Sequence, residues 1–428
     1  MSNAVGVLRS RVIGEGLWVS LGQGLTAIGL IVGIRLQTEF VPPDVFGTVA
    51  LVVGISSLVM GVVCQPLAQG ALRFLPDAVA TLQPNRFRWL IWTLAARQVG
   101  VALLAVLLLG GLWSAFGSGR PLGILALCGL LVIDAARLIG MAFFNAMRWQ
   151  RIYAGWAVAE AWGRPLAAVL LVIVFGASAE AVLSGYLLAS FSSFLLFGVP
   201  PLLRARRGRV SEEPLSPTVI DTVYRYARPL MPLGIVGWVN TVSDRYLIAG
   251  ILGVGQAGIY AAVYGLISRP FLMAQSTLEL TLRPLYFEAV TAGDRRREWR
   301  LYRRWLALNV FAGFLLLGIF MGGSDWIVRH LLGARYSSSV TLIPYLAIGH
   351  VMLITAYNLN SYLYAHQHTK EMFFISSAGA LVSVFLVASF AATWGLPGAA
   401  AACIAYFALQ AGISAWFIWS RERRRDNR

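Results

Sequence analysis

The sequence predicts an all-α, polytopic membrane protein with about twelve transmembrane helices. Hydrophobic residues make up 58% of the 428 residues, and the mean hydropathy is +0.70. Ordinary soluble domains are about 45–50% apolar, so a soluble core could not hold this excess. The apolar runs are mostly about 20 residues or longer, which fits helices that cross a bilayer rather than the roughly ten-residue strands of a membrane barrel.

Twelve such runs follow one another, separated by short polar segments. The first run contains Glu15 and Gln23 and is too long for the apolar part of a cleavable signal, so we interpret it as a membrane helix. On one side of the predicted membrane, every connection is too short to form a catalytic domain. The helices are expected at about residues 12–34, 44–69, 89–116, 121–147, 153–175, 181–203, 229–252, 257–286, 305–328, 341–364, 371–394 and 397–419.

Basic residues are distributed unequally between the two sides of the predicted membrane. Of the 35 Lys and Arg residues, 25 lie in the two terminal segments and in every second connection, whereas 4 lie in the remaining connections. Cytoplasmic loops of membrane proteins carry an excess of Lys and Arg. We therefore expect both termini in the cytoplasm, and the even number of helices requires the same placement.

The longest connection, about 204–228, lies near the middle of the chain and is strongly basic at its start. We interpret it as a cytoplasmic linker between an N-terminal six-helix bundle (1–203) and a C-terminal six-helix bundle with a basic tail (229–428). The two halves resemble each other weakly, and Gly47 aligns with Gly258 at an offset of 211 residues. Such a duplication suits a transporter whose halves rock about a midplane site, although two apolar helices also resemble each other by chance.

Ionisable residues inside membrane helices are costly, and by default they mark a pathway or a packed polar interior. A central Arg costs about 2.5–3.5 kcal/mol on an insertion scale, so these residues must be paired, near an interface or in contact with water. Side chains three or four residues apart share a helix face. This spacing predicts local pairs for Asp134–Arg137, Glu160–Arg164 and Glu279–Arg283, but none for Arg97, Arg269 or Glu15.

Each of these groups has a structural explanation beside a functional one. The pairs of Asp134, Glu160 and Glu279 lie towards helix ends, where ion pairs also serve to hold helices in place. Asp244 and Arg245 lie deeper and follow Asn240, so a polar face there favours the wall of a cavity. Glu15 could bind a coupling cation or pair with an Arg of the second half.

Composition also excludes several classes of function. The net charge is +16, but most basic residues flank apolar runs, where they suit membrane topology and anionic lipid headgroups rather than nucleic acid. Lys370 is the only lysine, so a P-loop of the form GxxxxGKS or GxxxxGKT cannot occur. The three cysteines and four histidines show no metal-ligand spacing. We therefore predict no enzymatic activity, no metal site, no cofactor and no nucleic-acid partner.

Three segments carry a family resemblance. The first, IRLQTEFVPPDVFGTVALVVG, contains Arg35-Leu36 and Phe46-Gly47. A second, RPLMPLGIVGWVNTVSDRYLIAGILGVGQAGIYAAVYGLIS, combines paired prolines with an Asp-Arg-Tyr and a Gly-Ile-Tyr, and the third is WGLPGAAAACIAYF. In order and spacing, over essentially the whole chain, the sequence resembles the polysaccharide biosynthesis flippases (O-antigen/exopolysaccharide lipid-linked oligosaccharide translocases) of the multidrug/oligosaccharidyl-lipid/polysaccharide (MOP) exporter superfamily.

The resemblance implies two six-helix bundles around a central cavity that opens alternately to each side of the cell inner (plasma) membrane. The implied cargo is a polyprenyl-pyrophosphate-linked oligosaccharide moved to the outer leaflet, and Arg suits its phosphates. We expect a monomer that contacts anionic membrane lipids, with a polysaccharide polymerase or glycosyltransferases as candidate partners. The residues expected at the substrate are Arg35, Arg97, Arg137, Arg164, Asn240, Asp244, Arg245 and Arg269, and those expected to couple an ion are Glu15, Asp134 and Asp244.

Three other functions stay open from the sequence. A cation-coupled multidrug exporter of the same superfamily should have acidic residues dominating its cavity, whereas interior Arg residues outnumber acidic ones here by 6 to 5. A membrane polymerase or glycosyltransferase should have a long outer loop or a catalytic carboxylate motif, and the sequence shows neither. A scaffold protein should have folded cytoplasmic loops rather than short basic ones.

Overall fold

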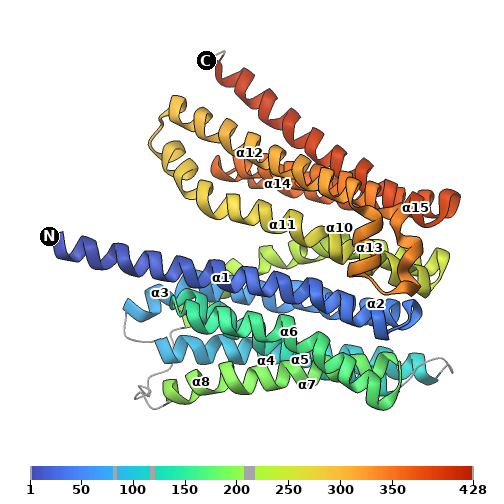
Figure 1. The fold of residues 1–428 in the computed structure, drawn as a ribbon. Coiled ribbons are helices and arrows are strands. Elements are labelled where there is room, and N and C mark those ends of the chain that lie inside the picture. The colour runs from blue at the N-terminus through green and yellow to red at the C-terminus, as the bar shows by residue number, and fades with distance from the viewer. Residues whose placement is uncertain (1, 81–83, 116–120, 207–216, 427–428) are drawn as a thin grey trace. The chain divides into compact units, whose positions relative to one another are not determined.

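The computed structural model describes residues 2–80, 84–115, 121–206 and 217–426, and every regular element in these ranges is a helix (Figure 1). Nine segments of these ranges are long and apolar enough to cross a membrane. The last of them lies in α15 (Thr369–Asp426), which is two helices joined at Gly395, where φ is +64°. With the long helices α1 (Ser2–Phe40) and α10 (Met231–Leu252), the all-α membrane fold of about 12 helices is confirmed.

The chain forms two compact units. Unit 1 consists of Met1–Val41 and Val52–Ile235, and unit 2 consists of Pro42–Leu51 and Val236–Arg428. The chain changes unit three times: between α1 and α2 (Pro43–Val59), then inside α2, and then inside α10. Residues 207–216 of the predicted linker lie outside the described part of the chain.

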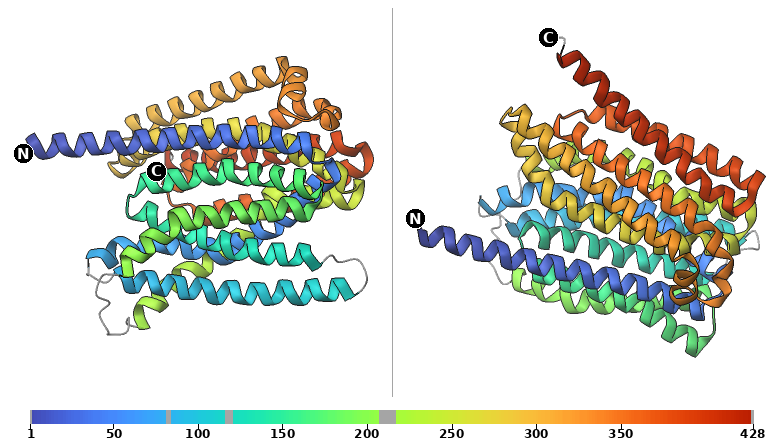
Figure 2. Two further views of the ribbon diagram at one scale, coloured as in Figure 1. Left: turned by 60° about the horizontal axis from the view of Figure 1, so that its bottom comes forward. Right: turned by 45° about the horizontal axis from the view of Figure 1, so that its top comes forward.

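In unit 1, α1 packs along α6 (Gln150–Phe175), and the two helices lie side by side in Figures 1 and 2. Small residues allow this approach: a Cβ atom at Gly29 would lie 2.6 Å from the indole of Trp162, whose Nε1 donates to the carbonyl of Leu25 at 3.0 Å. The other helices of unit 1 are η1 (Met60–Cys64), α3 (Gln65–Ala80), α4 (Pro84–Ala115), α5 (Pro121–Ala146), α7 (Ala179–Ser193), η2 (Phe194–Gly198), α8 (Val199–Arg206), α9 (Pro217–Ala227) and η3 (Arg228–Leu230).

In unit 2, α14 (Ile343–Ala365) packs against α15, α12 (Arg295–Gly322) and α11 (Val254–Thr291). The short elements α13 (Ser324–Leu331) and η4 (Ala334–Leu342) connect α12 to α14. At one end of the unit, buried aromatic side chains from three helices form a cluster, and every residue in it is less than 10% exposed. This cluster includes Tyr286, Tyr302, Trp305 and Tyr362.

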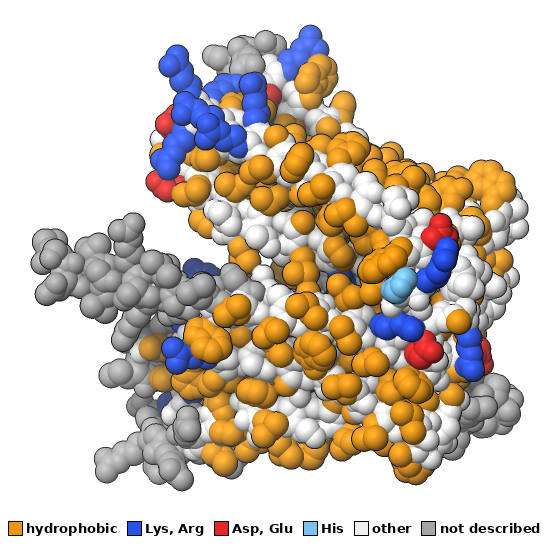
Figure 3. Space-filling view, viewed as in Figure 1, with side chains coloured by type: hydrophobic (Ala, Val, Ile, Leu, Met, Phe, Trp, Pro, Cys, Tyr) orange, Lys and Arg blue, Asp and Glu red, His pale blue; other side chains and the backbone are white. Residues whose placement is uncertain are grey.

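The basic connections of unit 2 meet at that same end. Arg295, at the start of α12, forms a 2.9 Å ion pair with Glu422 near the end of α15, and Arg421 pairs with Glu371 at the start of α15. On the face shown in Figure 3, Lys and Arg side chains gather where α11 meets α12 and where α15 ends, while hydrophobic side chains cover the length of the helices. Further Lys and Arg side chains lie at the right of this view, beside Asp and Glu side chains.

Candidate functional site

A buried charge network in unit 1 joins two of the pairs predicted from spacing. Arg164 on α6 donates from Nε to Glu160 Oε2 at 2.6 Å, as the four-residue spacing predicts, and its other end forms an ion pair with Asp134 on α5. Arg137 Nε lies 3.7 Å from the same carboxylate. The spacing therefore predicted both local pairs correctly, whereas the link between the helices depends on tertiary packing.

Two serines complete this network, and the sequence analysis did not identify them. Ser190 on α7 donates to Glu160 Oε2 at 2.9 Å, and Ser56 on α2 donates to Asp134 Oδ2 at 3.2 Å. The two carboxylates balance the charges of Arg164 and Arg137. Because Arg164 is 20% exposed at its side chain and contacts both carboxylates, its principal role in this conformation is to hold α5 and α6 together.

Two other predicted substrate contacts of unit 1 are more exposed. Arg35, near the end of α1, forms a 2.5 Å ion pair with Glu39 one turn later, a partner that the sequence analysis overlooked despite its four-residue spacing. Arg97 lies exposed on α4, and no carboxylate partner is found for it among the described residues. The side chain of Glu15 lies outside the described part of the chain, although its backbone belongs to α1.

In unit 2, Asp244 and Arg245 are adjacent on α10 but point in different directions. Asp244 is 4% exposed, and its carboxylate accepts from the Tyr260 hydroxyl at 2.8 Å and from the Arg245 backbone N–H at 2.8 Å. The Arg245 guanidinium instead lies over the ring of Tyr264, 5.3 Å from its centroid. Adjacent residues of an α-helix are about 100° apart around its axis, so the carboxylate and the guanidinium face different neighbours.

Arg269 on α11 is close enough to Arg245 for the two guanidinium groups to repel each other, and it also interacts electrostatically with Tyr264. Among the described residues, no carboxylate forms an ion pair with Arg245 or Arg269. Arg245 Nε is buried and donates no hydrogen bond in that part of the chain. The two arginines and Tyr264, which we call the Arg245–Arg269 cluster, therefore present two cations and a phenol, and Asp244 interacts with Arg245 electrostatically without forming an ion pair.

Asn240, which is predicted to contact the substrate, forms three hydrogen bonds within unit 2. Its Nδ2 donates to the carbonyls of Val236 and Ser376, each at 3.0 Å, and its Oδ1 accepts from Gln410 Nε2 at 2.8 Å. These hydrogen bonds connect α10 to α15. The hydrogen-bonding capacity of an amide side chain is then almost fully used, which leaves little for a ligand.

The remaining interior pair, Glu279 and Arg283 on α11, forms as its spacing predicts, with an Nη1–Oε1 distance of 2.7 Å. Arg283 also lies over the rings of Phe287 and Tyr364. Within the described residues, no group of three or more His, Cys, Asp or Glu side chains could hold a metal ion.

Comparisons with known proteins are consistent with these observations. A family model described as polysaccharide biosynthesis protein matches residues 38–341. No curated protein sequence matches the chain. The fold is similar to that of several solved transporters, all at low sequence identity.

Three of these structures show the extent of the likeness. The lipid II flippase MurJ, in an inward closed conformation, has a TM-score of 0.67 and 13% identity, covering 94% of this chain and 87% of that chain. The MATE multidrug transporter DinF-BH has a TM-score of 0.68 and 12% identity, covering 95% and 94%. A mutant of the Vibrio cholerae MATE transporter VcmN has a TM-score of 0.64 and 11% identity, covering 97% and 98%.

Proposed function

The chain belongs to the polysaccharide biosynthesis protein family, and on that premise we propose that it is a flippase for polyprenyl-pyrophosphate-linked oligosaccharide. It would move this lipid from the cytoplasmic to the outer leaflet by alternating access, without breaking a covalent bond. The fold is that of multi-pass transporters of the MOP superfamily. The observation that carries the proposal is the Arg245–Arg269 cluster, in which neither guanidinium group forms an ion pair with a carboxylate among the described residues.

The chemistry of the cargo supplies what this cluster lacks. A pyrophosphate carries two adjacent anionic groups, and each can accept a bidentate pair of hydrogen bonds from a guanidinium. An unpaired Arg costs about 2.5–3.5 kcal/mol at the centre of a membrane helix, so two neighbouring ones are disfavoured unless an anion or water neutralises them. Stacking on Tyr264 holds the Arg245 guanidinium in place before the ligand arrives.

The predicted substrate contacts of unit 1 fall into two groups, according to whether the arginine has donors free for a ligand in this conformation. Arg137 is 33% exposed at its side chain and lies 3.7 Å from its carboxylate, so it retains donors for a ligand, as do Arg35 and Arg97. Arg164 is saturated by Asp134 and Glu160 in this conformation and would contact substrate only after that network opens. Asp134 has two guanidinium neighbours and would likewise couple an ion only after that network opens.

Location and organisation belong to the same proposal. The excess of basic residues on one side supports an inner-membrane protein with both termini in the cytoplasm. We retain the two six-helix bundles 1–203 and 229–428, joined by the linker 204–228, as the bodies that rock. We also propose that the protein acts as a monomer, with a polysaccharide polymerase or glycosyltransferases as its partners.

The rival function is a cation-coupled multidrug exporter, because MATE transporters share the fold. The local charge argues against it: the Arg245–Arg269 cluster would repel a cationic drug, while Asp244 is 4% exposed and already accepts two hydrogen bonds. An anionic cargo fits this environment better.

The test uses purified protein in liposomes that hold polyprenyl-pyrophosphate oligosaccharide in one leaflet. Accessibility of the sugar to an external lectin reports transfer, under several imposed ion gradients. We expect transfer by the wild type and the Lys370→Ala control, and a loss of about tenfold or more for Arg245→Ala and Arg269→Ala, since charge-assisted hydrogen bonds contribute about 1.5–3 kcal/mol each. Absence of transfer together with efflux of a cationic dye would favour the exporter instead.

A further inference from the structure

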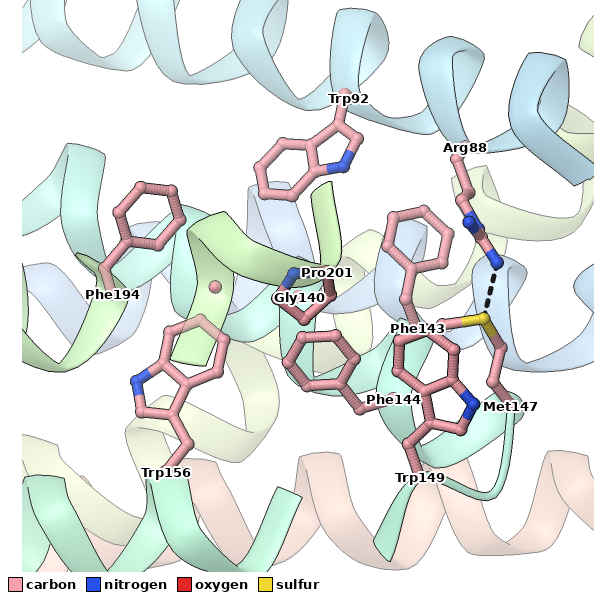
Figure 4. A pocket seen from close by; sticks show the side chains of 11 residues that line it. Arg88, Trp92, Gly140, Phe143, Phe144, Met147, Trp149, Trp156, Phe194 and Pro201 are labelled. Carbon is pink, nitrogen blue, oxygen red and sulfur yellow. Dashed lines mark hydrogen bonds between the residues drawn. The ribbon is translucent and has the colours of Figure 1, made fainter. Parts of the chain in front are cut away.

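Unit 1 contains a small aromatic recess that the proposed transport function does not use. It lies where the start of α4, the end of α5, the start of α6, η2 and α8 come together (Figure 4). Its wall includes the aromatic side chains of Trp92, Phe143, Phe144, Trp156 and Phe194. Its volume is about 30 Å³. A cavity of this size holds roughly two water molecules, so it admits a small chemical group rather than a whole lipid headgroup.

The polar groups of this wall are hydrogen-bond donors. Arg88 donates from Nη2 to the Met147 sulfur at 2.5 Å and from Nη1 to Asn85 Oδ1 at 3.4 Å, so its best-placed partner is a thioether, which is a weak acceptor. Figure 4 shows the guanidinium beside this sulfur, at one end of the recess. Arg88 Nε and the indole nitrogens of Trp92 and Trp156 are buried and donate to no acceptor in the described part of the chain.

The backbone around the recess is also unusual. Phe194–Gly198 forms a π-helical turn, and such turns occur frequently at functional sites. Gly198 is buried there, and a Cβ atom at this position would lie 2.7 Å from Phe194 and 3.2 Å from Trp156. The absence of a side chain at Gly198 therefore leaves room for two of the rings that form the wall.

The location of the recess indicates where its ligand would come from. Its elements meet at the end of unit 1 that carries Arg148, in the turn between α5 and α6, and Arg151, in the first turn of α6. Trp89, next to Arg88, is 69% exposed, and Trp149 is 38% exposed. Exposed tryptophans beside basic residues are typical of a membrane–water interface, and anionic lipids attract such basic ends in the cytoplasmic leaflet.

We propose that the recess is a binding site for an anionic phospholipid, whose phosphate contacts Arg88 and Trp92 while its chains follow the exposed apolar surface of α4 and α8. A phosphate supplies the acceptors that the buried donors lack and the negative charge that Arg88 lacks. A quaternary ammonium group would be repelled by the guanidinium, and a bare hydrocarbon chain would leave the donors unsatisfied. The assignment to the cytoplasmic leaflet depends on the orientation proposed above, whereas the chemistry of the ligand does not.

The experiment measures lipid retention by the purified full-length protein, using native mass spectrometry with phosphatidylglycerol and phosphatidylcholine as probes. Wild type should retain one phosphatidylglycerol molecule in preference to phosphatidylcholine. Arg88→Gln should weaken this binding by about tenfold or more. The matched control is Arg151→Gln, which removes a positive charge from the same end at a side chain that stacks on Trp18 and should retain the lipid like the wild type.

A second variant keeps the proposal testable if Arg88→Gln does not fold. Trp92→Phe preserves an aromatic ring and removes one donor, so it should weaken phosphatidylglycerol binding while its melting temperature stays close to that of the wild type. Equal retention of the two lipids, or unchanged phosphatidylglycerol binding in a folded Arg88→Gln protein, would overturn the proposal. The proposal would also be overturned if inorganic phosphate alone raised the melting temperature as much as phosphatidylglycerol does and if this rise depended on Arg88.

Discussion

Gly47 and Gly258 lie in backbone contact within unit 2, where α2 crosses α11. A Cβ atom at Gly47 would lie 2.1 Å from the carbonyl oxygen of Val254, and a Cβ atom at Gly258 would lie 1.8 Å from that of Pro43. The contacts are reciprocal, because adding the same offset of 211 residues converts Pro43 into Val254 and Gly47 into Gly258. A duplicated pair of helices around a local two-fold axis would produce such an arrangement, as in an isologous interface.

This crossing predicts that alanine is not tolerated at either glycine. Gly47→Ala and Gly258→Ala should each destabilise the protein by at least about 1–3 kcal/mol, since overpacking here is against backbone rather than flexible side chains. The measurement is thermal unfolding of the purified protein in detergent. Gly250→Ala on α10 is the control, because nothing lies within 4 Å of a Cβ atom there. Equal melting temperatures for all three variants would contradict the close crossing.

Sequence periodicity predicted much of this structure because membrane helices are determined locally. The predicted interruption between residues 394 and 397 coincides with Gly395, whose positive φ separates the two helices of α15. Likewise, the four-residue spacing predicted the contacts of Glu160 with Arg164 and of Glu279 with Arg283, because both partners lie on one helix.

Contacts between helices could not be predicted in this way. The link from Arg164 to Asp134 and the saturation of Asn240 by Gln410 depend on which helices become neighbours. The recess at Arg88 is assembled from several separate helices, so no local pattern in the sequence marks it. The divergence of Asp244 from Arg245, in contrast, follows from helix geometry and was available from the sequence.

The charge network of unit 1 predicts strong coupling between Glu160 and Arg164. Arg164→Gln alone leaves two buried carboxylates with fewer partners, so it should cost about 3–5 kcal/mol. Adding Glu160→Gln should recover part of that loss, with a coupling energy of about 0.5–3 kcal/mol in a double-mutant cycle of reversible unfolding. The exposed Arg35–Glu39 pair serves as a comparison and should show coupling of at most about 1 kcal/mol. Additive effects at Glu160 and Arg164 would indicate that the ion pair contributes nothing to folding.

The hydrogen bond from Tyr260 to Asp244 predicts that loss of the Tyr260 hydroxyl lowers stability and that neutralising Asp244 restores part of it. Tyr260→Phe removes a donor to a carboxylate that is 4% exposed, so it should destabilise the protein by about 1.5–3 kcal/mol. Asp244→Asn in the Tyr260→Phe background should restore part of the stability, because a neutral amide tolerates the loss better than a carboxylate does. Tyr345→Phe is the control for loss of a tyrosine hydroxyl group, because Tyr345 on α14 is 38% exposed. Failure of Asp244→Asn to restore stability would mean that another group compensates the carboxylate.

The Arg245–Arg269 cluster predicts opposite effects on stability and transport for one substitution. Arg269→Glu replaces the repelling neighbour of Arg245 with a carboxylate, so the melting temperature should rise if the two side chains form an ion pair. Transport of the pyrophosphate-linked lipid should fall by about tenfold or more, because the new carboxylate occupies Arg245 and repels the phosphates. Arg269→Gln, which removes the charge without supplying a partner, separates loss of a cation from gain of an anion. A parallel loss of stability and transport in Arg269→Glu would instead assign Arg269 a structural role, whereas unchanged transport would remove the cluster from the substrate path.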